Sequence, residues 1–93
     1  MTVKIVTKSI TAQNQFSDRA TLRGYFNFSL SGTWVATVTV QRSFDAGVTW
    51  FDVKTFVGNT EEYGFEPENE VLYMFGVKTG EYTSGTAVGR LSQ

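Results

Sequence analysis

The sequence predicts an all-β protein, a small antiparallel β-sandwich or β-barrel of about six or seven strands. Three observations lead to this fold class. Apolar residues recur at every second position along most of the chain, which is the period of a half-buried strand. No apolar stripe with a period of 3.6 residues extends over three helical turns. Turn-rich segments separate the alternating stretches, as in sandwiches and barrels.

Each expected strand is recognised by apolar side chains that share a parity. The strands are expected around residues 3–7, 22–30, 34–41, 51–57, 71–77 and 86–91, with a break in the chain at Ser31 and Gly32. Side chains that share the inward parity of these strands form the predicted core: Phe26, Phe28, Trp34, Val38, Val40, Phe51, Val53, Tyr73, Phe75 and Val77.

Chain length limits the domain organisation. The 93 residues form a single β domain over residues 1–93. Such a domain buries roughly two-thirds of the surface that its unfolded chain exposes. Because there is no cysteine, it must rely on its core or on neighbouring subunits for stability. Residues 1–20 are polar and weakly patterned, which fits either a partly extended N-terminal arm that orders against a neighbour or an ordinary first strand and loop.

The segment SFDAGVTW places Ser43, Asp45, Gly47, Thr49 and Trp50 at the spacing S-x-D-x-G-x-T-W. It resembles the Asp-box of sialidases and other β-propellers. A propeller needs at least four blades of about 40 residues each, and no second copy of the box follows here. A side-chain acceptor and a residue that tolerates positive φ serve a tight connection between strands. We therefore interpret the box as a structural turn, and a saccharide or calcium contact is the alternative.

An acidic segment, TEEYGFEPENE, follows the Asp-box. It is predicted to be a solvated surface loop, because a proline and an asparagine lie within it and the D-x-D-x-D-G spacing of a calcium loop is absent. A calcium site built from its carboxylates is the alternative. The segment contributes five possible partner contacts: Glu61, Glu62, Glu66, Glu68 and Glu70.

Composition disfavours several function classes. Without histidine or cysteine, the commonest general base and the thiolate nucleophile are both missing, so we expect no enzyme, no metal site and no cofactor. Paired carboxylates for glycoside hydrolysis are the least favoured alternative. The segment RGYFNF partly resembles an RNA-stacking motif but departs from it at Phe26, and the net charge is −1, so no nucleic acid is expected. No apolar run suggests a membrane span or a Sec signal.

Charge is divided unevenly along the chain. Residues 1–42 carry a net charge of +4, and residues 43–93 carry −5. A basic surface and an acidic surface on one small domain favour head-to-tail contact between copies, although the two halves can also interleave in space. The basic residues expected to contact a partner are Lys4, Lys8, Arg19 and Arg23.

Two long segments, GYFNFSLSGTWVATVTVQRSFDAGVTWFDV and YMFGVKTGEYTSGTAVGRLSQ, resemble a family of short proteins encoded by tailed bacteriophages. The similarity covers about residues 20–93, and the layout resembles an immunoglobulin or fibronectin type III sandwich. The resemblance implies a non-enzymatic virion protein made in the bacterial host cytoplasm. Its expected role is that of a head decoration or cement subunit on the major capsid protein, forming a homo-oligomer or lattice. A neck, tail or fibre component is the first alternative.

A carbohydrate-binding module for host adhesion is the second alternative. Aromatic side chains stack on sugar rings when they line one face of a domain. The candidates for such a face are Trp34, Trp50, Tyr63, Tyr73 and Tyr82.

Overall fold

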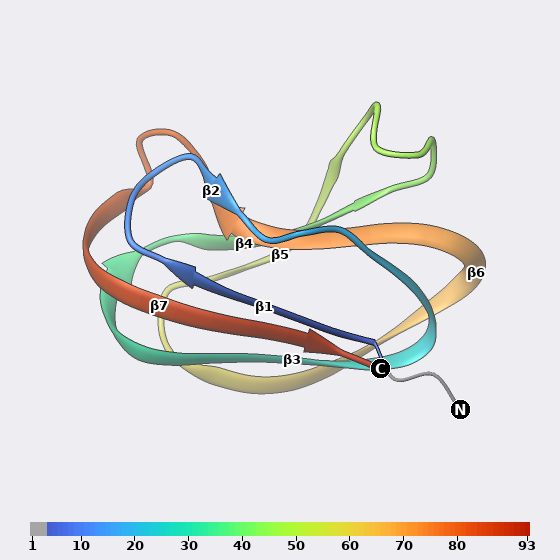
Figure 1. Cartoon of the computed structure of the whole chain (residues 1–93), viewed down its shortest axis with the longest axis horizontal. Coiled ribbons are helices and arrows are strands. Elements are labelled where there is room, and N and C mark those ends of the chain that lie inside the picture. The colour runs from blue at the N-terminus through green and yellow to red at the C-terminus, as the bar shows by residue number, and fades with distance from the viewer. Residues whose placement is uncertain (1–3) are drawn as a thin grey trace.

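The computed structural model describes residues 4–93 and confirms the all-β fold class (Figure 1). Its seven antiparallel strands form one sheet that folds over a single core, as in a β-sandwich or barrel, in the order β1-β7-β3-β6-β4-β5, with β2 paired to β6. The strands are β1 (Ile5–Ile10), β2 (Gln15–Phe16), β3 (Ala20–Ala36), β4 (Val38–Ser43), β5 (Phe51–Phe56), β6 (Thr60–Val77) and β7 (Tyr82–Ser92).

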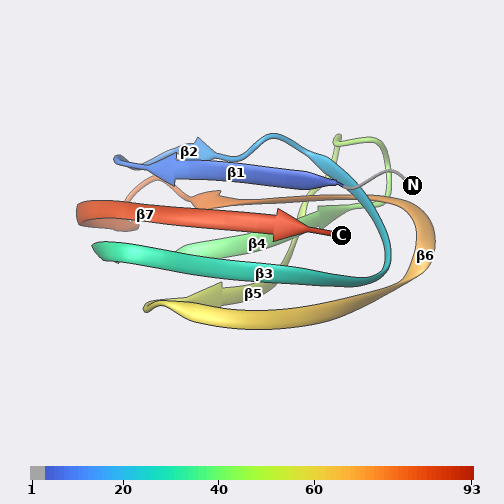
Figure 2. The ribbon, with the colours of Figure 1, turned by 60° about the horizontal axis from the view of Figure 1, so that its bottom comes forward.

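Strand β6 bends sharply and joins the two layers of the fold. Figure 2 shows it turning back at one end of the molecule, so that its two halves lie in different layers. Residues 60–66 pair with β3, whereas the later residues pair with β4, β2 and the start of β3. At the bend, residues 67–70 stand opposite the single residue Arg23, and Glu70 has a φ of 60°. The predicted acidic loop is therefore wrong: it is a strand with a bulged corner.

The buried core largely follows the predicted parity. Among the predicted core residues, Trp34 is only partly buried, and Phe51 and Val53 are wrong because about half of each side chain is exposed. Both lie on β5, which pairs only with β4 and forms an edge of the sheet. Alternation identifies the strand but does not show that it lacks a covering layer. The other seven predicted residues are buried, together with Ile10, Ala20, Leu22, Leu30, Val71, Ala87 and Leu91.

The predicted break at Ser31 and Gly32 is also wrong, because β3 continues through it to Ala36. Gly32 has a φ of 98°, and its partner strand β7 contains Gly85 with a φ of 87°. A Cβ on Gly32 would lie 2.4 Å from the carbonyl oxygen of Thr86. The glycine thus permits close approach of two paired strands and does not end either of them.

The N-terminal segment forms an ordinary first strand. β1 pairs with β7 from Ile5 opposite Ser92 to Ile10 opposite Ala87, and Ile10 is fully buried. Ser17 then fixes the chain to β6, because its hydroxyl accepts a hydrogen bond from the Phe75 amide. The interpretation of residues 1–20 as an extended arm is therefore wrong for residues 5–17. Residues 1–3 lie outside the described part of the chain.

Thr39 offers a simple stability test. Only 1% of this β4 residue is exposed, and its hydroxyl has no hydrogen-bond partner. Since an unpaired buried hydroxyl costs free energy, Thr39→Val is expected to raise the free energy of unfolding by about 1 kcal/mol. Urea denaturation measures the change. Ser43→Ala is the opposing control and should lower the stability, because the Ser43 hydroxyl is buried but hydrogen-bonded. A loss of stability in Thr39→Val would contradict an unpaired Thr39 hydroxyl.

Candidate functional site

The Asp-box forms the turn between β4 and β5, and its five residues lie together as predicted. The Ser43 hydroxyl lies 2.7 Å from Oδ1 of Asp45 and accepts a hydrogen bond from the Gly47 amide at 2.9 Å. Oδ1 of Asp45 also accepts from the Thr49 amide at 2.8 Å. The Trp50 indole donates to the Gly47 carbonyl at 3.1 Å. Side chains thus satisfy the backbone where the ladder ends, which is a structural role.

Arg19, which directly precedes β3, packs onto this turn. Its guanidinium carbon lies 5.3 Å from the centre of the Trp50 ring, a cation–π distance. A Cβ on Gly47 would lie 2.3 Å from Arg19 Nη1, so the glycine also makes room for the guanidinium. Arg19 was predicted as a partner contact, but its charged group contacts its own chain.

The Asp45 carboxylate is held in its charged form. The hydrogen bond from the Thr49 amide, followed by that from the Ser43 hydroxyl, lowers the pKa of Asp45 to about 2. A depressed pKa means that the charged form stabilises the turn above its ordinary pKa of 3.8, and that this contribution is lost as the pH falls through about 2.

We expect Asp45→Ala to loosen the turn while the sheet stays folded. The Thr49 amide loses its acceptor, so its hydrogen exchange should accelerate, measured by NMR. In the unmodified chain the Asp45 carboxyl resonance should titrate with a midpoint near 2. Amides of β7 serve as the internal control. Unchanged exchange at Thr49 would contradict the role assigned to Asp45.

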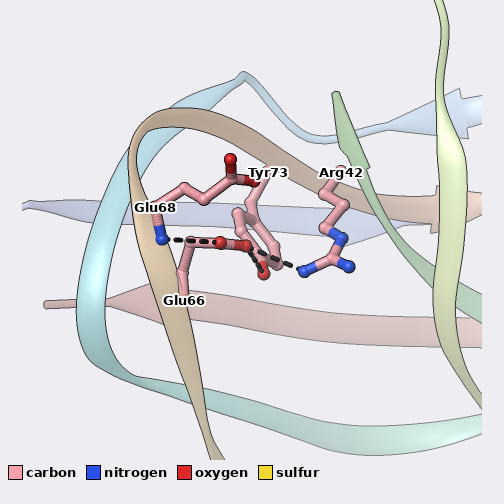
Figure 3. A network of polar contacts seen from close by, with 4 residues as sticks. All are labelled: Arg42, Glu66, Glu68 and Tyr73. Atoms are coloured by element: carbon pink, nitrogen blue, oxygen red, sulfur yellow. Dashed lines mark hydrogen bonds and ion pairs between the residues drawn. The ribbon is translucent and has the colours of Figure 1, made fainter. Parts of the chain in front are cut away.

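Glu66 forms a buried polar network at the β6 corner (Figure 3). Its Oε1 accepts hydrogen bonds from Arg42 Nη1 at 3.0 Å and from the Tyr73 hydroxyl at 2.7 Å. Its Oε2 accepts from the Glu68 amide at 3.1 Å. Only 1% of Glu66 is exposed, so its prediction as a surface contact is wrong. The network fastens the corner of β6 to β4.

Electrostatics keep Glu66 ionised. Burial is the largest single effect and raises the pKa of Glu66, but the hydrogen bonds from Tyr73, Glu68 and Arg42 together outweigh it and leave the pKa below its usual value. Burial and then the hydrogen bond to Glu66 raise the pKa of Tyr73 to about 12. With donors on both oxygens and no exposed surface, the carboxylate serves structure.

The remaining predicted contact residues do not gather in one place. Glu62 forms an ion pair with Lys54 at 3.0 Å, and Lys4 donates to the Thr21 carbonyl. Lys8 lies half-buried on β1, and exposed Arg23 lies opposite the corner that carries exposed Glu68 and Glu70. Basic and acidic residues therefore lie on neighbouring strands at this corner, which is the interleaving of the two halves that the sequence left open.

A cluster of exposed aromatic side chains lies on the outer face of β3 and the first half of β6. Tyr25, Tyr63 and Phe65 are 70%, 76% and 55% exposed. The ring centre of Tyr25 lies 4.9 Å from that of Phe65 and 6.3 Å from that of Tyr63. We call these three residues the aromatic cluster. Aromatic side chains that pack on one another in solvent are typical of interaction surfaces.

A second exposed group, the hairpin patch, consists of Phe44, Phe51 and Val53 beside the Asp-box. The rings of Phe44 and Phe51 lie 6.1 Å apart, and the guanidinium of Arg42 lies 4.9 Å from the Phe44 ring. The three side chains are about half exposed and, with Arg42 and Asp52, line a shallow groove.

Sequence reasoning missed most of these exposed rings, although one signal was present. Tyr25 has the opposite parity to Phe26 and Phe28, which places it outside the core. Of the aromatic residues predicted to bind sugar, only Tyr63 is well exposed, and Tyr73 is wrong because it is buried. Because Tyr73 is buried and Trp34 and Tyr82 are only partly exposed, the predicted set does not form one exposed face. Trp34 donates a hydrogen bond to Asn59, and Tyr82 donates one to the Gly85 carbonyl.

Comparison with known proteins gave no match to a protein-family model, a curated protein or a solved structure. Within residues 4–93, no group of three or more histidine, cysteine, aspartate or glutamate side chains could hold a metal ion. The described part of the chain also has no helix long and apolar enough to cross a membrane. The aromatic cluster and the hairpin patch are the features that suggest a function.

Proposed function

We propose that this chain is a non-enzymatic structural protein of a bacteriophage particle, a head decoration or cement subunit that binds the major capsid protein. The observation that carries the proposal is the presence of two separate exposed aromatic surfaces, the aromatic cluster and the hairpin patch, on 93 residues. Aromatic anchors dominate binding energy in protein interfaces. A subunit that bridges neighbours needs at least two such surfaces.

The framework behind these surfaces supports the proposal. The rings of the aromatic cluster stand on the paired strands β3 and β6, whereas Phe51 stands on β5 and Phe44 lies in the hydrogen-bonded Asp-box turn, so little conformational entropy is lost when they bind. Repeated copies on a lattice then multiply modest single contacts through avidity. The resemblance of two long segments to phage-encoded proteins agrees with this role.

Mass spectrometry of purified particles of the encoding phage tests the location. We expect copies of this chain in numbers close to those of the major capsid protein. A small number of copies per particle would move the chain to the neck, tail or fibre. Absence from particles would overturn the virion role.

The hairpin patch is the surface we assign to the capsid protein. Phe51→Ser is expected to lower occupancy when purified protein is added to particles that lack it, because the variant removes an exposed anchor. Val57→Ser is the matched control, since Val57 is also exposed but lies outside both aromatic surfaces. Equal occupancy for both variants would exclude the hairpin patch as the contact.

Saccharide binding is the second candidate, favoured by the exposure of Tyr25 and Tyr63 beside Asn27. The rings of the aromatic cluster are inclined by 54° and 57° to one another, so they do not form a flat platform for a sugar. A glycan array separates the candidates. Binding that is lost in Tyr63→Ser would favour the saccharide function.

A further inference from the structure

Two neighbouring rows of side chains cross the outer face of β1, β7, β3 and the first half of β6. Residues that stand opposite each other in an antiparallel pair point to the same face. The first row contains Ile5, Ser92, Asn27 and Tyr63, in that order across the four strands. Its two ends, Ile5 and Tyr63, are exposed, and between them Asn27 is polar and exposed whereas Ser92 is polar and buried.

The second row contains Thr7, Arg90, Ser29 and Glu61 in the same strand order. Arg90 and Glu61 are both exposed, and neither forms an ion pair within residues 4–93. The Glu61 carboxylate accepts a hydrogen bond from the Ser29 hydroxyl at 3.2 Å. The two charges lie on opposite sides of β3, at the same level along it.

We propose that this outer face binds the same face of a second copy of the chain, in a dimer whose two-fold axis runs along β3. Such an axis places β7 of one copy over β6 of the other copy. Each residue then faces a partner residue at the same height along β3. Arg90 then faces the partner's Glu61, and the partner's Tyr63 lies over Ser92 beside Ile5. Each contact occurs twice, which is the self-complementarity that a two-fold interface requires.

The shape of the face fits this arrangement. Along the axis, the outward residues of β3 are Tyr25 and Asn27, then the small polar residues Ser29, Ser31 and Thr33, and then Val35. The small residues in the middle allow two sheets to approach to about 10 Å. Under this axis β7 faces the first half of the partner's β6, and β1 has no strand opposite it. Because β6 and β7 stand at the same level only beside residues 27–30 of β3, the overlap is roughly 300 Å² in projection, at a strand spacing of about 4.8 Å and a rise of about 3.3 Å per residue. This is the size of a weak, transient contact that depends on its charge pairs, so we expect a dissociation constant in the high micromolar range.

The dimer goes beyond the proposed particle function and does not rest on it, because the purified chain alone should form it. It also leaves the hairpin patch outside the contact. A dimer then presents two such patches, which adds to avidity on a lattice.

Charge reversal tests the dimer by sedimentation velocity at concentrations from about 1 µM to about 1 mM, a range that brackets micromolar affinity. Glu61→Arg and Arg90→Glu should each weaken dimerisation about tenfold or more, because each places like charges together twice. The double variant E61R/R90E restores both pairs and should dimerise like the unmodified chain. Misfolding cannot produce that rescue.

Glu68→Arg is the matched control, with the same charge change at an exposed corner residue outside this face. It should leave dimerisation unchanged. A monomer at the highest concentration in the unmodified chain would overturn the proposal. Dimers that persist in both single variants, or a double variant that stays monomeric, would equally overturn it.

Discussion

Replacing Glu66 with alanine is expected to lower the free energy of unfolding by about 3 kcal/mol, the largest effect of any single side chain in the β6 corner. The substitution removes the acceptor of three donors at once. Arg42 is partly exposed and can turn to water, but the Tyr73 hydroxyl stays buried without a partner. The loss therefore falls at the lower end of what breaking a buried ion pair costs.

Urea denaturation followed by tryptophan fluorescence measures this loss. Glu68→Ala is the matched control, because it makes the same change two residues away at an exposed position and keeps the backbone amide that donates to Glu66. Its effect should stay within about 0.5 kcal/mol. Similar losses in both variants would show that the corner, and not the buried carboxylate, sets the stability.

The same carboxylate predicts a pH dependence. Because the pKa of Glu66 is lowered on folding, its contribution is present above the ordinary pKa of 4.5 and is lost as the pH falls through the folded value. The stability difference between the unmodified chain and Glu66→Gln should therefore shrink as the pH falls below 4.5. A difference that stays constant down to the acid transition would contradict an ionised Glu66.

The fold class could be predicted because alternation reports burial directly. Phe26 and Phe28, and likewise Val38 and Val40, share one parity and are buried. Periodicity does not show which strands pair or which strand lies at an edge. Phe51 and Val53 therefore alternate like core residues, although they lie on the edge strand β5. Pairing depends on contacts far apart in sequence.

The corner of β6 could not be predicted for a different reason. Five glutamates within ten residues, together with Pro67, indicate a solvated loop by composition. Glu66 is nevertheless buried, because Arg42 on β4 and Tyr73 beyond the bend of β6 supply donors to its carboxylate. Partners of this kind are set by tertiary structure. The predicted break at Gly32 was wrong for the same reason, since the role of this glycine depends on the backbone of β7 beside it.

Only part of the candidate site could be predicted. The Asp-box turn follows from local chemistry, since its acceptors and donors lie within four residues of each other. Glu61 and Tyr63 were identified, but Arg90 was not, because their common face exists only through the pairing of β6 and β7 with β3. A surface that three strands form together cannot be predicted until the register between the strands is known.

The close approach of β3 and β7 gives the second large expected effect. Gly85→Ala is expected to lower the free energy of unfolding by about 4 kcal/mol, of which about 1 to 2 kcal/mol comes from the left-handed backbone and the rest from steric overlap. Gly85 has a φ of 87°. A Cβ there would lie 2.2 Å from the Thr33 carbonyl oxygen and 2.6 Å from the Trp34 Cα, and neither atom can move without disturbing the ladder.

Gly80→Ala separates the two causes. Gly80 has nearly the same φ, 85°, but a Cβ there meets nothing within 4 Å. It should lose only about 1 to 2 kcal/mol for the backbone conformation. The difference between the two variants in urea denaturation then measures the overlap alone. Equal losses would mean that the ends of β3 and β7 separate easily, and that Gly85 is required for its φ and not for the approach of the strands.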